Sequence, residues 1–158
     1  MKRPISGLVA LAAFLINPAF AVGADHDHHH DGQSVKLQLN AGTKWQTDAP
    51  LRRSMAAIRQ SVAENLHTIH EDRLPATSYS MLARTIEDAV ATIIAQCRLP
   101  PAADAQLHLV VAELMAGAQL MSGTADSGQA HSGAIRVVEA LNNYAKYFDD
   151  PDFKSLEH

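Results

Sequence analysis

The stretch 51-LRRSMAAIRQSVAENLHTI-69 decides the fold of this chain. Its apolar residues recur at steps of three and four, which places them on one stripe of an α-helix at about 100° per residue. Thr47 or Asp48 can cap this helix, Pro50 suits its opening turn, and Arg73-Leu74-Pro75 ends it. The apolar stripe consists of Leu51, Met55, Ile58, Val62, Leu66 and Ile69.

Three further stretches repeat this helical pattern. One begins near Thr77 and ends at residues 99–101, one follows those prolines, and one precedes Pro151. Strand formers are sparse and alanine is very common after residue 50, which favours helix. Four amphipathic helices of roughly 20 residues with short loops predict an all-α fold, an up-down-up-down four-helix bundle. The three stripes are Leu82, Ile86, Val90, Ile93 and Cys97; then Leu107, Val110, Val111, Leu114, Ala118 and Met121; then Ala134, Val137, Val138, Leu141, Ala145 and Phe148.

The first 21 residues have the pattern of a secretory signal peptide. Lys2 and Arg3 precede an uncharged run of 18 residues that ends in Ala19-Phe20-Ala21. A membrane span needs about 20 apolar residues. We therefore expect cleavage after Ala21, export to the periplasm, and no membrane association of the mature chain.

These features divide the chain into four parts. They are a signal peptide (1–21), a flexible His-rich arm with its linker (22–46), the helical bundle (47–149) and a C-terminal tail (150–158). The formal net charge is −4, and loss of the two signal-peptide cations makes it −6. This excess of acid argues against nucleic acid or an anionic membrane as a partner. The one cysteine cannot form an intramolecular disulfide.

The arm contains the strongest compositional signal in the chain, 25-DHDHHHD-31. Four histidines and three aspartates within seven residues bind Cu(II), Zn(II) or Ni(II) to some degree. A disordered arm must lose entropy to close around an ion, which indicates modest affinity and a role in capture or delivery. The alternative is a solvated leader that keeps the N-terminus soluble. The candidate ligands are His26, His28, His29 and His30.

A second candidate site lies at one end of the expected bundle. In antiparallel hairpins Met55, Cys97 and His108 come to the same level, with Trp45 and Tyr144 nearby. Thioether, thiolate and imidazole form a soft ligand set suited to copper, above all Cu(I). The alternative is that the methionine and the free cysteine are ordinary core residues and the histidine is a surface residue.

The opposite end of the expected bundle also collects histidines. His67 and His70 lie one turn apart on the first helix, and His131 reaches the same level on the last. His67 and His70 both lie outside the apolar stripe, so they face water or a neighbouring subunit. Solvated surface side chains are the preferred interpretation here.

Two segments resemble a known family. Residues 51–58 resemble the first helix of the periplasmic four-helix-bundle b-type cytochromes, in which a methionine matching Met55 is an axial haem ligand. Residues 142–147 resemble that family's last helix, but Ala145 stands where the family has its axial histidine. The resemblance implies the bundle fold and non-covalent haem bound through Met55. From its expected level in the bundle, His108 could supply the ligand that Ala145 lacks, from a different helix. Residues 44–48 and 97–101 are also similar to small exported proteobacterial proteins labelled DnrO.

No catalytic motif stands out. The chain lacks Gly-x-Ser-x-Gly, His-Glu-x-x-His, a phosphate-binding loop and the Cys-x-x-Cys-His of covalent haem attachment. A di-iron bundle needs Glu-x-x-His pairs, yet Glu87 is followed by Val90 and Glu113 by Ala116. We expect an exported, non-enzymatic protein that binds a transition metal, copper first and zinc next. The alternatives are a haem electron carrier using Met55, and a periplasmic interaction or stress protein that binds a partner protein.

Overall fold

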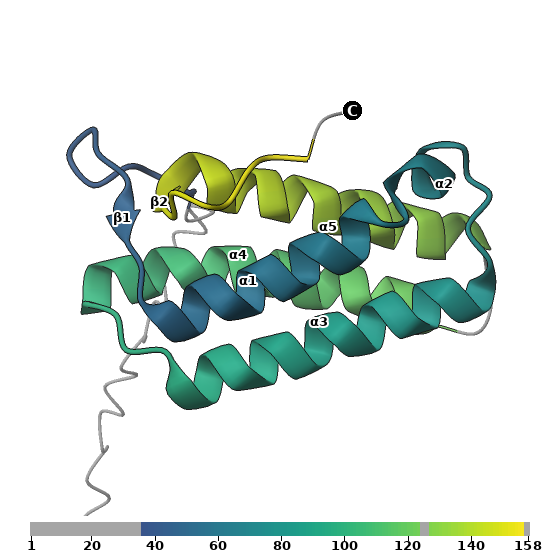
Figure 1. The fold of residues 1–158 in the computed structure, drawn as a ribbon, viewed down its shortest axis with the longest axis horizontal. Helices are drawn as coiled ribbons and strands as arrows, with labels where there is room; N and C mark the ends of the chain where they lie inside the picture. Colours follow the sequence, from purple (N-terminus) through teal and green to yellow (C-terminus); the bar gives the residue numbers. More distant parts are fainter. Residues whose placement is uncertain (1–35, 124–126, 157–158) are drawn as a thin grey trace, which may run out of the picture. The chain divides into compact units, whose positions relative to one another are not determined.

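The computed structural model describes residues 36–123 and 127–156, and this part of the chain is mainly helical, as predicted (Figure 1). The histidines of the arm and the signal peptide lie outside the described residues. Within the described ranges, no helix is long and apolar enough to cross a membrane. The elements are β1 (Trp45–Gln46), α1 (Ala49–Ala63), α2 (Leu66–His70), α3 (Ala76–Gln96), α4 (Pro101–Ser122), α5 (Ser127–Tyr147) and β2 (Phe148–Asp149).

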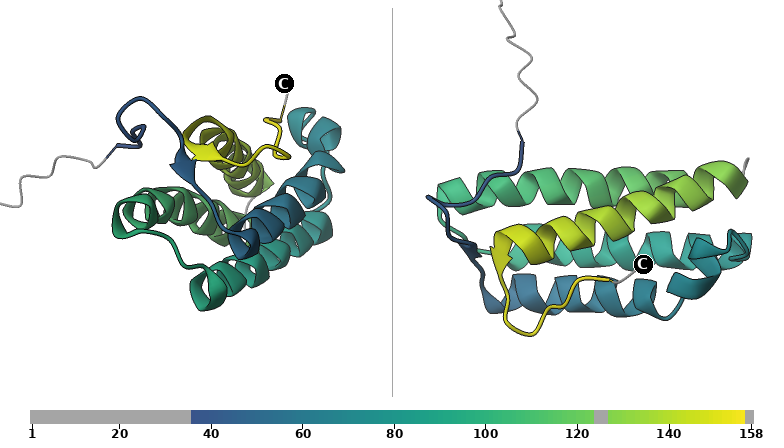
Figure 2. Two further views of the ribbon diagram at one scale, coloured as in Figure 1. Left: turned by 60° about the vertical axis from the view of Figure 1, so that its left-hand side comes forward. Right: turned by 90° about the horizontal axis from the view of Figure 1, so that it is seen from above.

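The four long helices α1, α3, α4 and α5 lie side by side around one apolar core, and together they are called the helical body (Figures 1 and 2). Helix α4 packs on α5 and α3, and α1 packs on α3. At the α4–α5 contact a Cβ on either Gly117 or Gly133 would come within 2.6 Å of the other residue's carbonyl oxygen. The two backbones therefore approach so closely that neither position leaves room for a side chain.

Most residues of the four predicted stripes are buried in this core. Ala145 is only partly buried, and the fully buried residue at this level of α5 is Tyr144. Phe148 is fully buried, but it belongs to β2 rather than to a helix. Leu66, Cys97 and Val111 are partly buried and pack against the edge of the core.

The prediction of one continuous helix through Ile69 is wrong. Helix α1 ends at Ala63, and Asn65 has φ −112° and ψ 0° before the short α2 begins. The Asn65 side-chain amide donates a hydrogen bond to the Ser61 carbonyl at 2.9 Å. Such a local side-chain bond competes with the helix backbone and favours an end at this point. Ile69 is nevertheless buried, because α2 folds back over the body.

A short parallel pairing of β1 with β2 joins the residues before α1 to the residues after α5. Trp45 of β1 lies opposite Phe148 of β2, and the Thr47 hydroxyl donates to the Asp149 carbonyl at 2.6 Å. The Lys44 ammonium donates to the Ala145 carbonyl at 2.7 Å. We call residues 44–47 together with 148–150 the clasp.

The C-terminal segment 150–156 lies against the helical body and joins α1 to α5. Phe153 and Leu156 are buried. The Arg59 guanidinium of α1 donates to the Lys154 carbonyl, and the Asn142 side chain of α5 bonds both backbone groups of Leu156. This segment, expected as a tail, thus forms one wall of the surface described below.

Candidate functional site

The three residues of the expected bundle-end metal site differ in burial. Met55 is 0% exposed, inside the core. The His108 side chain is 72% exposed on the outside of α4, where its Nδ1 lies 2.8 Å from the Asp104 carbonyl oxygen and 3.4 Å from the Asp104 carboxylate. His108 is therefore held along the surface of its own helix and does not share a buried position with Met55.

Cys97 belongs to a different network. Its thiol donates to the Asp48 carboxylate at 3.5 Å, and Asp48 also accepts backbone bonds from Leu51 at 2.9 Å and Arg98 at 2.7 Å. Burial, together with the nearby Asp48 charge, raises the pKa of Cys97 to about 11. At neutral pH the thiol keeps its proton and directs it at the Asp48 carboxylate. The Cys97–Asp48 pair connects the end of α3 to the start of α1.

Asp48 stays ionised in this network. Burial alone would raise the pKa of its carboxyl, but the amides of Arg98 and Leu51 outweigh burial and lower the pKa below 3.8. In the described part of the chain, no three or more His, Cys, Asp or Glu side chains gather closely enough to hold a metal ion. The four arm histidines fall outside that part of the chain.

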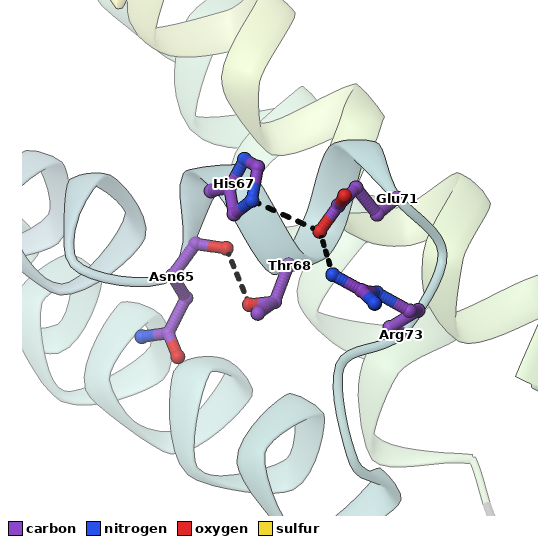
Figure 3. A network of polar contacts seen from close by, with 5 residues as sticks. All are labelled: Asn65, His67, Thr68, Glu71 and Arg73. Atoms are coloured by element: carbon purple, nitrogen blue, oxygen red, sulfur yellow. Dashed lines mark hydrogen bonds and ion pairs between the residues drawn. The ribbon is translucent and has the colours of Figure 1, made fainter.

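At the opposite end, the histidines of α2 make surface contacts. His67 Nε2 lies 3.1 Å from the Glu71 carboxylate, which also pairs with Arg73, and the Thr68 hydroxyl donates to the Asn65 carbonyl at 2.9 Å (Figure 3). The side chain of His67 is 82% exposed. This network closes the turn between α2 and α3.

Beside this turn lie two polar atoms that the sequence does not single out as unusual. Tyr79 Oη and His131 Nε2 are buried and make no hydrogen bond within the described residues. Asp72, whose φ of +49° is rare for a residue with a side chain, has its carboxylate 3.9 Å from His131 Nδ1. Burial and the Asp72 charge raise the pKa of Tyr79. A buried polar atom without a partner lowers stability.

A surface feature that sequence reasoning missed is a groove of about 780 Å³ between α1 and the C-terminal segment. We call it the α1 groove. Its apolar floor includes Ala56, Ala63 and Phe153. Three guanidinium groups also line it, those of Arg52, Arg53 and Arg59. Helix α1 contains these three arginines and no acidic residue. That charge pattern within residues 49–63 is the sequence signal that could have indicated the site.

The groove arginines contact neutral groups. Arg52 donates to the Thr47 carbonyl at 2.8 Å, and Arg59 donates to the Lys154 carbonyl while its guanidinium lies 5.9 Å from the Phe153 ring centroid. Within the described residues, Arg53 makes no hydrogen bond and none of the three forms an ion pair. On α5, by contrast, Arg136 forms a two-bond ion pair with Glu113. The positive charge along α1 is therefore not neutralised by direct contact with a carboxylate.

Comparisons of this chain with protein-family models, with curated proteins and with solved structures found no match. The resemblances to the b-type cytochromes and to the DnrO proteins are neither supported nor refuted by them.

Proposed function

We propose that this chain is an exported, non-enzymatic protein that captures transition-metal ions, copper before zinc, through the arm segment 25-DHDHHHD-31. The observation that carries the proposal is the density of ligands, four imidazoles and three carboxylates in seven residues. Imidazole suits Cu(II) and Zn(II), and affinity for the same site is higher for Cu(II). A signal peptide over residues 1–21 would deliver this segment to the periplasm, close to the new N-terminus.

The helical body has a supporting role in this proposal. Its four long helices surround one core, and only residues 97–100 join α3 to α4, which favours an up-down-up-down four-helix bundle. The described contacts favour the arm over the bundle end as the metal site, because Met55 is enclosed in the core, the Cys97 thiol bonds Asp48 and His108 is exposed on the outside of α4. The body then serves as a stable carrier for the arm.

The test compares metal binding by the native exported protein and by two variants. One replaces His26, His28, His29 and His30 with alanine, and the control combines Met55→Leu with His108→Gln. We expect the arm variant to lose at least tenfold in Cu(II) and Zn(II) affinity by titration calorimetry. Its melting temperature in metal-free buffer should not change, and the control should bind metal like the parent.

Two results would contradict the proposal. Unchanged Cu(II) affinity in the arm variant would show that the histidines only solubilise the N-terminus. A Soret band in the natively exported protein that is lost in the combined Met55→Leu and His108→Gln variant would establish the haem carrier in its place.

A further inference from the structure

We propose that the α1 groove binds an extended, acidic peptide segment of a partner protein. This inference is independent of metal capture, because it rests on the helical body and on none of the arm residues. Three features carry it, namely the charge of α1, the way its arginines are held, and the length and floor of the groove.

The α1 side of the groove is positively charged, and the three acidic residues of the lining, Glu64, Asp150 and Asp152, lie away from this row of arginines. The protein has a net charge of −4, yet α1 carries three arginines and no acid. Arg52 and Arg59 are seven residues apart, so they lie two turns apart on the same side of the helix, separated by about 10 Å. Ala56 lies between them on that side. A row of cations separated by a small side chain is complementary to carboxylates spaced along a ligand.

Two of these arginines are already oriented. The Arg52 and Arg59 guanidinium groups are held by backbone carbonyls of residues 47 and 154. Each guanidinium has five N–H donors, so such anchoring leaves further donors for a carboxylate. Arg53 is exposed and makes no polar contact within the described chain, so binding of a carboxylate would not require it to break one. Preorganised donors lose less entropy on binding, which favours recognition.

The shape of the groove favours a peptide over a compact anion. It follows α1 from Ala49 to Glu64, a length of about 22 Å at 1.5 Å per residue. An extended chain of about seven residues spans that distance. The floor of alanines and Phe153 can accept small or apolar side chains that alternate with acidic ones.

The acidic groups of the groove set the orientation of that peptide. Glu64 lies at the far end of α1, and Asp150 and Asp152 lie on the opposite wall. The buried Asp150 carboxylate already accepts a hydrogen bond from the Tyr144 hydroxyl at 3.0 Å. The acidic side chains of the peptide should therefore face the arginine row and avoid both the far end and the opposite wall.

The experiment measures fluorescence anisotropy of a labelled decapeptide of alternating glutamate and alanine with the full-length protein. Arg53→Gln and Arg59→Gln should each weaken binding about fivefold, and the double variant more than tenfold. Arg53→Lys should retain part of the affinity because it keeps the charge. Arg84→Gln, an exposed arginine of α3 outside the groove, is the matched control and should bind like the parent. Raising the ionic strength should weaken binding.

Several results would overturn the proposal. One is that a peptide with glutamine in place of glutamate binds as tightly as the glutamate peptide. Another is that the Arg53→Gln and Arg84→Gln variants bind the peptide with the same affinity. A third is complete competition by millimolar inorganic phosphate, which would indicate a small-anion site. A concentration-dependent dimer that Arg53→Gln dissociates would show that the groove holds a second copy instead. Arg53→Gln removes no contact within the described chain, so an unchanged melting temperature separates lost binding from lost folding.

Discussion

The two ends of the helical body differ in how completely their buried polar groups are paired. At the clasp end the buried Tyr144 hydroxyl donates to the Asp150 carboxylate at 3.0 Å. At the α2 end Tyr79 Oη and His131 Nε2 are buried without such a partner in the described chain. The buried hydroxyl of Tyr144 is therefore hydrogen-bonded, whereas that of Tyr79 is not within the described chain.

The two ends also differ in how far apart in the sequence their hydrogen-bonded residues lie. Hydrogen bonds of the clasp join residues about one hundred positions apart, such as Thr47 with Asp149. The hydrogen bonds around α2 join close neighbours, such as Asn65 with Ser61, and the long-range Asp72–His131 contact is a loose one at 3.9 Å. We expect the clasp end to contribute more to global stability, and the α2 end to open locally at lower free energy.

The largest expected effect is at the clasp. Phe148 is 0% exposed and its ring stacks on Tyr144 at a centroid distance of 5.2 Å. Phe148→Ala should lower the free energy of unfolding by about 3–5 kcal/mol, because it removes buried surface and leaves a cavity. Urea denaturation followed by circular dichroism measures this loss. The matched change at the other end is Leu66→Ala, at a partly buried position, which we expect to cost about 1 kcal/mol. Equal losses at the two ends would remove the proposed difference.

Substitution of Asp48 should cause an intermediate loss of stability. Asp48→Ala removes the cap of α1 and the partner of the Arg98 amide, so we expect a loss of about 2 kcal/mol. Asp48→Asn can still accept one of these bonds and should cost less.

The pH dependence of this effect has a definite sign. Because the pKa of Asp48 is lower in the folded protein than the ordinary 3.8, its ionised form adds stability above about pH 4. That contribution disappears as the pH falls through the folded pKa. The stability difference between the parent and Asp48→Asn should therefore shrink between pH 6 and pH 2, and a constant difference would contradict the assigned role.

Periodicity was sufficient to predict the four long helices, because stripe residues such as Ile58 and Leu114 face one core. It could not predict the end of α1, where a single Asn65 side chain decides the outcome. Strands of two residues, such as β1 and β2, carry no periodic signal at all. Their pairing depends on where distant parts of the chain meet in the folded state.

The candidate sites also combine features that local sequence predicts with features that depend on tertiary contacts. Spacing placed Met55 and Cys97 on apolar stripes but could not show that Cys97 would bond Asp48, or that His108 would face outward. The α1 groove has a local signal in its arginines, yet its second wall contains Phe153, which reaches α1 through a long-range contact. Local chemistry is readable from the sequence, whereas the surface that completes a site depends on tertiary packing.

The smallest and most discriminating effect comes from the same substitution at both ends. Tyr144→Phe removes the donor to Asp150, whose carboxylate then lies buried with one bond fewer, so we expect a loss of about 1–2 kcal/mol. Tyr79→Phe removes a hydroxyl that has no partner in the described chain, so its stability should stay the same or rise by about 1 kcal/mol. Urea denaturation of the two variants in one buffer gives the comparison directly.

The sign of the change in unfolding free energy caused by Tyr79→Phe shows whether the buried hydroxyl at the α2 end has a hydrogen-bond partner. Both substitutions remove one oxygen from a ring that is at most 2% exposed, so differences in apolar burial cancel between them. What remains is the hydrogen bond that one hydroxyl makes and the other lacks. A clear loss of stability in Tyr79→Phe would mean that its hydroxyl is satisfied in solution, and the two ends would then be equally well paired. A gain would show that the α2 end retains a destabilising polar group in the folded protein, as the structure indicates.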